Sequence, residues 1–401
     1  MRSAYGFQIP REDPQITHIG PGTPAGELLR RYWHPVCLSA DLKDLPKRVR
    51  ILGEDLVAFR DGRGQPGLLF FRCSHRGTSL EYGRIEECGL RCCYHGWLYD
   101  TEGRVLEMPM EPADSTFKDK VQQPGYPVQE YGGLVFAYLG PLDTMPLLPK
   151  FDLWLQEGGT LRASLGPRVG GASDCNWLQS QENLMDILHS QWLHTAHSRP
   201  QFPSDLYAIM PEVVYEETEM GMKATMTRHL PDGRRWDVTW EMVMPMTTHL
   251  VYTAVPQTAR YFIVYFCIPV DDTHQLAANI TWIPDDGSDL GGGRRGLAPA
   301  SRTDKTYEYT QRYPDDKEAQ EGQGPIAIHA LEHLATSDRG VIMLRRMLRT
   351  ALAALEAGQD PKGVLRDPER ARCIRTVAGS VIHEPAAGAA MAGASPTGER
   401  R

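Results

Sequence analysis

Hydrophobic and polar positions divide the chain into two strand-rich regions with a helical stretch between them. Residues 45–145 hold short alternating or wholly apolar runs, such as RVRILGEDLVAFR and GLVFAYLG, and turn-forming segments such as DGRGQPG separate these runs. Short runs bounded by Gly, Asp and Pro are typical of antiparallel strands joined by turns. The pattern therefore predicts a small β domain, and residues 20–34, GPGTPAGELLRRYW, predict a capped helix ahead of it.

The second half of the chain begins with a different pattern. Residues 176–197, NWLQSQENLMDILHSQWLHTAH, contain neither Gly nor Pro and predict one long helix. Strand-like runs return between 210 and 283 and predict one larger antiparallel sheet. A glycine-rich loop at 287–302 follows, and two further helices are expected around 315–334 and 337–357.

These elements predict an α+β protein in which a small all-β domain precedes a domain made of helices and an antiparallel sheet. We expect a helical lead-in over residues 1–40, the β domain over 41–150 and the larger domain over 151–384. The Ala- and Gly-rich end, 385–401, has the composition of a disordered tail.

Composition and charge narrow the class of protein. The chain has 401 residues, 41% of them hydrophobic and 23% charged, as in ordinary globular proteins. Its net charge of −8 argues against nucleic acid or an anionic membrane as a partner, because both attract a basic surface. We see no transmembrane run and no apolar signal-peptide core near the start, so we expect a cytoplasmic protein.

Cysteine and histidine cluster in the small β domain. Four of the eight cysteines lie between Cys73 and Cys93, and two Cys-His pairs stand out, Cys73-x-His75 and Cys92-x-x-His95. Two Cys and two His can hold zinc, or a [2Fe–2S] cluster in which two imidazoles replace two thiolates on one iron. Because each pair mixes one Cys with one His, the cluster fits better than a zinc finger, which pairs like with like.

The predicted helix at 176–197 carries a second group of metal-binding residue types. Asp186 and His189 are three residues apart and share one helical face. His189 and His194 are five apart, so they converge only if the helix contains a π-like bulge or ends between them. His194 and His197 would pair more easily on a regular helix. Spacing alone does not decide between these pairs.

Five sequence segments together resemble one enzyme family. The segments CSHRGTSL and C-x-x-H-G-W resemble the Rieske motif, and D-x-x-H-x-x-x-x-H after such a domain resembles the iron motif of Rieske non-haem iron aromatic-ring oxygenases. The segments GPGTPAGELLRRYWHPV and QEGQGPI resemble the phthalate dioxygenase-like (α3) branch. The resemblance implies an oxygenase component that inserts oxygen from O₂ into an aromatic substrate.

The resemblance also assigns metal ligands. It implies that a [2Fe–2S] cluster binds Cys73, His75, Cys92 and His95, which makes Cys93 a spacer. It implies that a mononuclear Fe(II) binds His189, His194 and one later carboxylate, while His197 is structural. Motif context favours Asp316 as that carboxylate, with Asp338 as the alternative.

The same resemblance gives Asp186 a separate role. In the family, the matching acid bridges a Rieske histidine of one subunit and an iron histidine of the next. Here the pair would be His95 and His189, which implies a head-to-tail ring of subunits, a homotrimer. We find no Gly-rich dinucleotide motif, so we expect a separate NAD(P)H-dependent reductase, with a flavin, a ferredoxin or both, to supply electrons.

Substrates of this branch are often aromatic carboxylates, which favour a cationic partner near the iron. The predicted strands offer Lys223, Arg228, Arg234 and Arg235. Asp237 stands where phthalate-type members tend to have arginine, which argues against phthalate itself. Two other hypotheses remain: an electron-transfer protein without an oxygenase site, and a zinc-stabilised binding protein.

Overall fold

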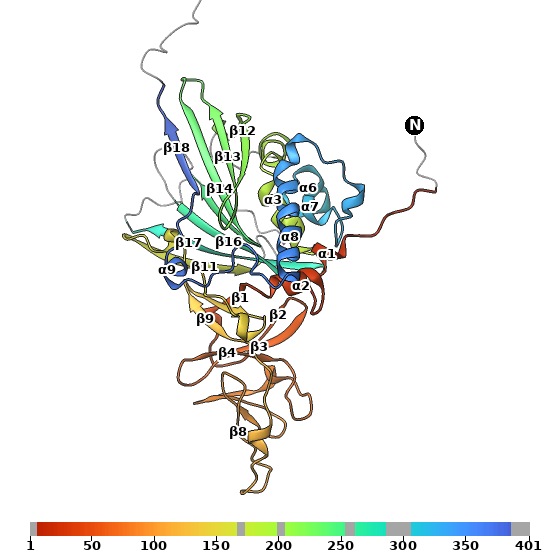
Figure 1. The fold of residues 1–401 in the computed structure, drawn as a ribbon, viewed down its shortest axis with the longest axis vertical. Helices are drawn as coiled ribbons and strands as arrows, with labels where there is room; N and C mark the ends of the chain where they lie inside the picture. The colour runs from red at the N-terminus through yellow and green to blue at the C-terminus, as the bar shows by residue number, and fades with distance from the viewer. Residues whose placement is uncertain (1–5, 167–172, 199–204, 253–260, 286–305, 386–401) are drawn as a thin grey trace, which may run out of the picture.

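The computed structural model describes residues 6–166, 173–198, 205–252, 261–285 and 306–385. Figure 1 shows an elongated molecule with the larger sheet and most helices at one end and small sheets tapering toward the other. The predicted loop at 287–302 lies outside the described residues, as does all but the first residue of the predicted tail at 385–401.

The tapering end contains three small antiparallel sheets. The first joins β1 (Trp33–Leu38), β10 (Leu134–Tyr138) and β9 (Val128–Tyr131), and the second joins β2 (Lys47–Ile51), β3 (Glu54–Arg60) and β4 (Pro66–Phe70). The third, at the tip, has the order β5 (Arg84–Glu86), β6 (Gly89–Arg91), β7 (Leu98–Tyr99) and β8 (Val105–Glu107). Residues 33–38 therefore belong to the same sheet as residues 128–138, although the directly paired residues of β1 and β10 are at least 96 positions apart in the sequence, as in Leu38 and Leu134.

The large sheet has eight strands, all paired antiparallel. Its order is β11 (Gly159–Gly166), β17 (His274–Pro284), β16 (Tyr261–Asp271), β15 (Thr247–Tyr252), β14 (Arg235–Val243), β13 (Gly221–His229) and β12 (Glu212–Glu217), and β18 (Gly379–His383) pairs with β14. The sheet predicted for residues 210–283 is confirmed, and so is the α+β fold. Strands β11 and β18 join the sheet from outside the range that we predicted.

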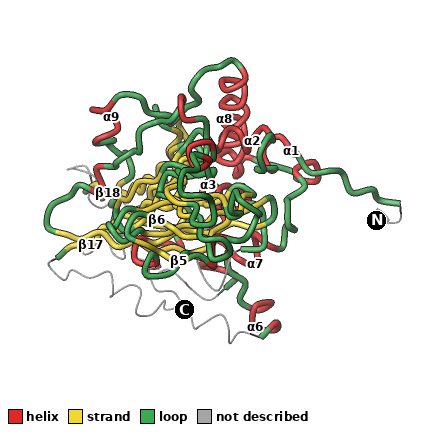
Figure 2. Tube along the Cα trace, turned by 90° about the horizontal axis from the view of Figure 1, so that it is seen from below, coloured by secondary structure: helices red, strands yellow, loops and turns green. Residues whose placement is uncertain are grey.

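Helices pack beside the large sheet and around the waist of the molecule (Figures 1 and 2). They are α1 (Pro14–Thr17), α2 (Pro24–Leu29), α3 (Trp177–Met185), α4 (His189–Trp192), the π-helix η6 (Leu193–His197), α6 (Tyr307–Arg312), α7 (Asp316–Glu321), α8 (Arg339–Glu356) and α9 (Pro368–Arg372). Short 3₁₀ turns are η1 (Ser39–Asp41), η2 (Leu80–Tyr82), η3 (Phe117–Lys120), η4 (Leu142–Thr144), η5 (Asp152–Trp154), η7 (Asp205–Ala208), η9 (His329–Leu331) and η10 (Thr336–Asp338).

Three helix predictions need correction. The helix expected at 20–34 is only α2, because the chain from Trp33 onward pairs as β1. The helix is capped, as expected, and the cap is Thr23. The helix expected at 176–197 breaks after Met185 and resumes at His189. The helix expected at 315–334 ends at Glu321, because Gly322, Gly324 and Pro325 follow, and Gly324 has a positive φ of 97°.

The core explains how the two ends are joined. One continuous apolar cluster includes residues of β1 and β10 from the small sheets and residues of β16 and α8 from the larger end. Phe136 of β10 meets Phe266 of β16 with ring centroids 5.7 Å apart. A smaller, separate apolar cluster lies under the loops of the tip and contains Cys73, Cys92 and Trp97. The loops at the tip therefore rest on a core of their own.

Candidate metal centres

The two Cys-His loops at the tip have closely similar backbones. In the first loop, the N–H of Cys73 donates to the carbonyl of Thr78, and Gly77 donates back to Cys73. In the second, Cys92 donates to Trp97, and Gly96 donates back to Cys92. Gly77 and Gly96 have φ values of 75° and 73°, and a Cβ on Gly96 would lie 2.8 Å from Pro109 Cγ. Glycine therefore lets each loop turn tightly around the same point.

The four predicted ligand side chains of these loops come together. Both thiols are 3% exposed, whereas His75 and His95 are nearer the surface, with ring centroids 4.4 Å apart. His75 also stacks on Trp97 at 4.6 Å. Two buried sulfurs beneath two accessible imidazoles form a donor set that fits a [2Fe–2S] cluster with mixed ligands.

The acid–base state of the thiols supports this fit. Hydrogen bonding from Cys92, and further from the Tyr99 hydroxyl 3.0 Å away, outweighs burial and lowers the pKa of Cys73 to about 5. The neighbouring Cys73 thiolate raises the pKa of Cys92. The two sulfurs are therefore close enough to perturb each other's ionisation, as expected of two ligands of one cluster. The adjacent Cys93 is exposed and lies outside this group.

A second convergence lies at the larger end of the molecule. His189 begins α4, His194 lies in the π-helix, and Asp316 is the first residue of α7. Nε2 of His189 and Nε2 of His194 lie 3.4 Å and 3.1 Å from Oδ1 of Asp316. One donor atom from each residue lies within 4.8 Å of the others, in a site where His194 is 7% exposed and the other two side chains about a fifth. Two imidazoles and one carboxylate are the donor set of a non-haem ferrous site.

The π-helix makes the five-residue spacing workable. The N–H of Ser198 donates to the carbonyl of Leu193, five residues back, which is the hydrogen bond of a π-helix. The Ser198 hydroxyl donates to the carbonyl of Pro314 at 2.5 Å, which ties this turn to the residues before α7. His189 and His194 thus face one point with ring centroids 5.3 Å apart. The bulge that the sequence required for this pair is present.

Comparison with known proteins decides the family. A profile of the Rieske [2Fe–2S] domain matches residues 32–131. The chain is 40% identical over 378 residues to phenoxybenzoate dioxygenase subunit alpha of Ectopseudomonas oleovorans, covering 90% of each protein. The chain belongs to the Rieske non-haem iron oxygenases.

Other relatives agree. The oxygenase is 42% identical over 369 residues to the tert-butanol monooxygenase / tert-amyl alcohol desaturase oxygenase subunit of Aquincola tertiaricarbonis, covering 86% of this chain and 77% of that protein. It is 32% identical to the phthalate 4,5-dioxygenase oxygenase subunit of Pseudomonas putida, covering 88% of each. Pseudomonas putida CBB5 NdmA, solved with theobromine as a QL mutant, shares the fold with a TM-score of 0.65 at 22% identity, covering 90% of this chain and 99% of that one. The family predicted from the motifs is confirmed, and with it a Rieske [2Fe–2S] cluster and a mononuclear iron as cofactors.

The alternative carboxylate lies elsewhere in the oxygenase. Asp338 stands at the start of α8, and its carboxylate accepts a hydrogen bond from the backbone N–H of Ala335 at 2.5 Å. It is absent from the group that Asp316 forms with the two histidines. His197 also lies apart: its ring is exposed and stacks on Trp192 at 6.4 Å. The structure thus brings Asp316, and neither Asp338 nor His197, to His189 and His194.

Side chains outside the predicted set orient the three convergent residues. The Nδ1 of His189 donates to the backbone carbonyl of Asp186, which leaves Nε2 directed at Asp316. Burial lowers the pKa of His189, but the Asp316 carboxylate outweighs it, so the pKa is raised overall.

Asp315 lies beside the other histidine. It caps α7 through a capping box with Glu318, and its carboxylate lies 3.9 Å from Nδ1 of His194. Contacts of this kind fix the ring orientation of metal-binding histidines.

Asn183 is a residue of the site that the sequence analysis missed. Its amide nitrogen lies 3.2 Å from Oδ1 of Asp316 and 3.4 Å from Nε2 of His189. It precedes Asp186 by one helical turn, so the i, i+3 spacing that linked Asp186 to His189 could have found it. Buried amides behind it join α3 to α7: Gln179 Nε2 donates to the carbonyl of Gln320 at 2.8 Å.

The cationic residues considered for substrate binding have partners in the structure. Lys223 pairs with Glu216 at 3.0 Å, Arg234 with Asp232 at 2.7 Å and Arg235 with Asp237 at 3.1 Å. Arg228 is buried, its Nε donates to the carbonyl of Ile209, and its guanidinium lies 5.3 Å from the centre of the Trp236 ring. Of the four, Arg228 alone lies inside the protein.

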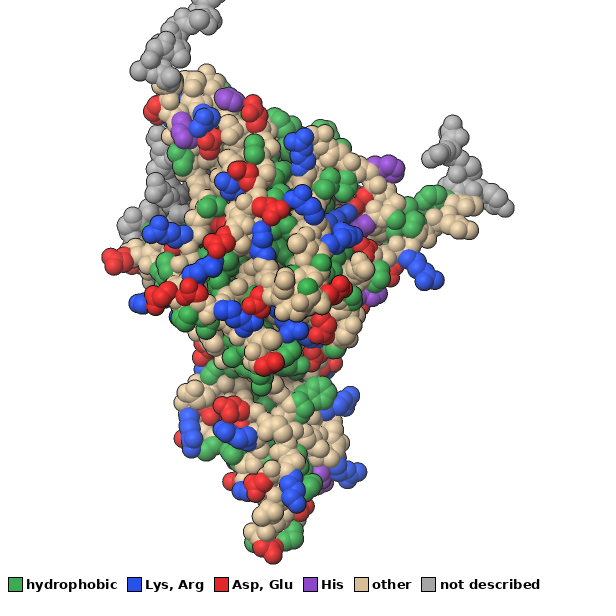
Figure 3. All heavy atoms as spheres, in the orientation of Figure 1, with side chains coloured by type: hydrophobic (Ala, Val, Ile, Leu, Met, Phe, Trp, Pro, Cys, Tyr) green, Lys and Arg blue, Asp and Glu red, His purple; other side chains and the backbone are tan. Residues whose placement is uncertain are grey.

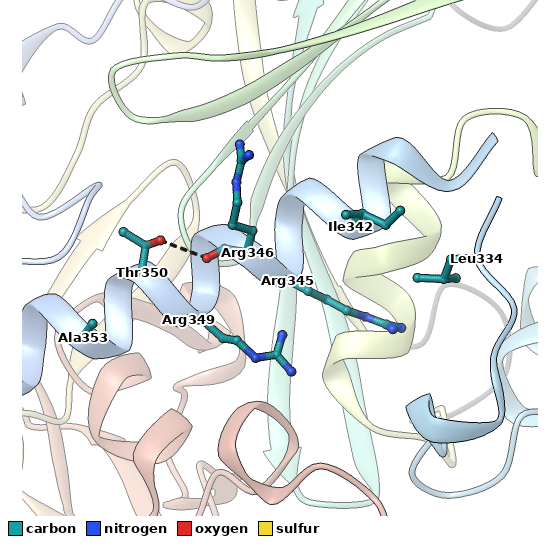
Figure 4. A pocket seen from close by; sticks show the side chains of 7 residues that line it. All are labelled: Leu334, Ile342, Arg345, Arg346, Arg349, Thr350 and Ala353. Atoms are coloured by element: carbon teal, nitrogen blue, oxygen red, sulfur yellow. Dashed lines mark hydrogen bonds between the residues drawn. The ribbon is translucent and has the colours of Figure 1, made fainter. Parts of the chain in front are cut away.

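A second cluster of possible metal ligands in the oxygenase is better explained by an arginine. Glu182, His329 and Glu332 offer donor atoms within 4.8 Å, but the Arg345 guanidinium binds both carboxylates. Figure 4 shows Arg345 leaving α8 toward α3, and Arg345 lines an open groove of about 640 Å³ together with Leu334, Ile342 and Arg349. The cluster is therefore an ion-pair network that joins α8 to α3.

The described helices do not include one long and apolar enough to cross a membrane. The face shown in Figure 3 mixes acidic and basic side chains over both ends of the oxygenase. No single-sign patch of the kind that binds a polyanion is seen on that face.

Proposed function

We propose that the chain is the terminal oxygenase component of a multi-component system and that each convergent group holds one of the two cofactors. Cys73, His75, Cys92 and His95 hold the [2Fe–2S] cluster. His189, His194 and Asp316 hold the mononuclear iron. The observation that carries the proposal is the convergence of three donor atoms from α4, the π-helix and α7 on one partly buried point. An electron carrier without an oxygenase site would not need this second convergence.

When bound, the cluster would relay single electrons, and a ferrous ion held by His189, His194 and Asp316 would supply the activation of O₂. The chain's own residues hold the geometry for that chemistry. The carbonyl of Asp186 fixes the His189 ring, and the Asn183 amide donates to Asp316. The buried ring of His194 limits the access of water on its side of the site.

We further propose that Asp186 links two subunits of a homotrimer arranged head to tail. Its carboxylate would join His189 of its own chain to His95 of the neighbouring subunit. Supporting this, His95 lies toward the surface of the tip, while Asp186 lies at the break before α4. Electrons would come from a separate NAD(P)H-dependent reductase with a flavin, a ferredoxin or both.

For the substrate we propose an aromatic compound bearing a carboxylate, which the enzyme would hydroxylate, dihydroxylate or O-demethylate. The relatives named for phenoxybenzoate and phthalate support this class, whereas the tert-butanol relative offers a non-aromatic alternative. Arg228 is the candidate cation inside the protein. Substrate-dependent O₂ uptake with phenoxybenzoate, phthalate and tert-butanol, in the presence of a reductase, separates these possibilities.

The metal assignment is tested on anaerobically purified protein. We expect two irons and two acid-labile sulfides from the cluster plus one further iron per chain, and a Rieske-type EPR signal after dithionite reduction. Asp316→Asn should lose the further iron and keep the cluster, whereas the matched control Asp338→Asn should keep both. Iron loss in Asp338→Asn but not in Asp316→Asn would reverse the assignment. Zinc without sulfide would sink the cluster itself.

A further inference from the structure

The break between α3 and α4 is held by one tyrosine. Helix α3 ends at Met185, and Asp186 leaves the helical conformation with a ψ of 74°. The hydroxyl of Tyr215, on β12, donates to the carbonyl of Met185 at 3.0 Å. One side chain thus binds the peptide group that joins Met185 to Asp186.

Helix α8 presses this tyrosine against the break. Gly340 is the second residue of α8, and a Cβ built on it would lie 2.2 Å from the Met185 carbonyl oxygen and 2.5 Å from Tyr215 Cε1. Real Cβ atoms do not approach so closely, so only glycine allows α8 to pack here. The ring of Tyr215 and the end of α3 therefore have little freedom to move apart.

The position of Asp186 controls two groups at once. Its carbonyl accepts the hydrogen bond from Nδ1 of His189, and its carboxylate is the proposed bridge to the neighbouring subunit. Burial raises the pKa of this carboxyl, His189 opposes that shift, and Asp338 adds to it. A small rotation of the backbone at Asp186 would therefore move two groups. It would move the Asp186 carboxylate itself, and it would move the His189 ring, which is hydrogen-bonded to the Asp186 carbonyl.

We propose that Tyr215 is a positioning residue for electron transfer between subunits, because its hydroxyl holds the peptide group directly before Asp186. The proposal rests on the bridging role proposed above for Asp186. In the step concerned, one electron leaves the reduced cluster of the neighbouring subunit and one arrives at the mononuclear iron. Tyr215 is neither oxidised nor deprotonated.

Tyr215 remains a hydrogen-bond donor at any ordinary pH. Burial raises its pKa to about 12, which the Ile187 N–H opposes and the charges of Asp186 and Asp338 reinforce. The hydroxyl therefore keeps its proton through the step and continues to donate to Met185. Its contribution is one of alignment alone.

The test needs no substrate. The full-length enzyme with both cofactors is oxidised with ferricyanide, its cluster is reduced by a pulse of dithionite, and freeze-quenched EPR follows the loss of the high-spin ferric signal. Tyr215→Phe removes only the hydroxyl, and Gly340→Ala disturbs the same break from the side of α8. The matched control is Tyr32→Phe, because the hydroxyl of the buried Tyr32 likewise donates to a backbone carbonyl, that of Lys362 at 2.7 Å.

We expect Tyr215→Phe and Gly340→Ala to slow the loss of the ferric signal about tenfold, the effect of losing one hydrogen bond from the alignment. Both should keep wild-type iron, sulfide and Rieske EPR spectra, and Tyr32→Phe should behave as the wild type. Wild-type transfer in both variants, or loss of iron from both, would overturn the positioning role.

Asp186→Asn separates this proposal from the one on which it rests. If Asp186→Asn transfers electrons at the wild-type rate, the bridge itself is wrong and the role of Tyr215 fails with it. If Asp186→Asn is slow while the Tyr215 and Gly340 variants are normal, the bridge stands and the positioning role alone fails.

Discussion

Replacing Arg345 with methionine should show what the ion pairs between α8 and α3 contribute. Arg345 donates to both carboxylate oxygens of Glu182, at 2.5 Å and 2.7 Å, and to Glu332 at 3.0 Å. The side chains of Arg345 and Glu182 are 10% and 9% exposed. Methionine keeps the apolar stem of the arginine and removes its charge, so the variant leaves a buried carboxylate without its cation.

Protonation of Glu182 limits the size of the effect. Burial already raises the pKa of Glu182 above its ordinary 4.5, with Arg345 opposing the shift. Without Arg345 the carboxyl can take up a proton, and at pH 7 that costs at most about 3 kcal/mol, from 1.36 kcal/mol per pH unit above 4.5. At pH 5 the same limit is below about 1 kcal/mol. A raised pKa of Glu182 means that the folded state binds this proton more tightly than the unfolded state does. The loss of unfolding free energy in Arg345→Met therefore grows as the pH rises from 5 to 7.

Urea or thermal unfolding at pH 7 and at pH 5, followed by tryptophan fluorescence, measures this difference. The deficit at pH 7 corresponds to a melting temperature lower by up to about 10 °C for a domain of this size. The matched control is Arg349→Met, on the same helix, whose partner is Asp13 and whose side chain is 47% exposed. That variant should cost less than about 1 kcal/mol at either pH. Equal costs for the two variants, or a cost for Arg345→Met that does not depend on pH, would refute the reasoning.

Three further predictions concern the tip and the first sheet. Burial lowers the pKa of His34 to about 4, so the unfolded state takes up a proton at a higher pH than the folded state does. The free energy of unfolding should therefore fall by about 3 kcal/mol between pH 6.5 and pH 4. His34→Gln cannot titrate in this range and should flatten that part of the plot of melting temperature against pH. Tyr99→Phe removes a hydroxyl that lies 3.0 Å from the Cys73 sulfur. The reduction potential of the cluster, measured in an EPR-monitored titration, should fall by about 40 mV. An unchanged potential would contradict a hydrogen bond donated by Tyr99 to that sulfur. Cys92→Ser should abolish the Rieske EPR signal while Cys93→Ser leaves it intact, and the reverse result would exchange the two cysteines.

The sequence predicted the tip of the molecule well because its information is local. Each Cys-His pair lies within one short loop, and the glycine that closes the turn lies in the same loop. Alternating apolar positions likewise marked the strands of the large sheet, because one face of each strand is buried: Met222, Ala224 and Met226 on β13 are all less than 5% exposed. Where the local pattern of apolar residues agrees with burial in the fold, the sequence alone predicts the element.

The convergence of His189, His194 and Asp316 was predicted from the sequence, but the break of the helix after Met185 was not. Residues 176–197 have the composition of a continuous helix, and nothing local ends it at Met185. The break is stabilised by Tyr215 and Gly340, which lie 30 or more residues away in the sequence. The five-residue spacing of His189 and His194 was the one local sign that the helix could not be regular.

The five-residue spacing of His189 and His194 is incompatible with a regular helix at this site. A regular helix through residues 186–198 would keep every backbone hydrogen bond but would turn one of the two histidines away from Asp316. The observed chain gives up part of this regularity, and a distant group, the Tyr215 hydroxyl, binds the carbonyl of Met185 at the break. The Ser198 hydroxyl in turn ties the end of the π-helix to the carbonyl of Pro314. Local preference and the metal site thus conflict along this segment, and conflicts of that kind are expected at functional sites. The partners that resolve the conflict are accordingly the residues whose replacement should disturb the chemistry while leaving both cofactors bound.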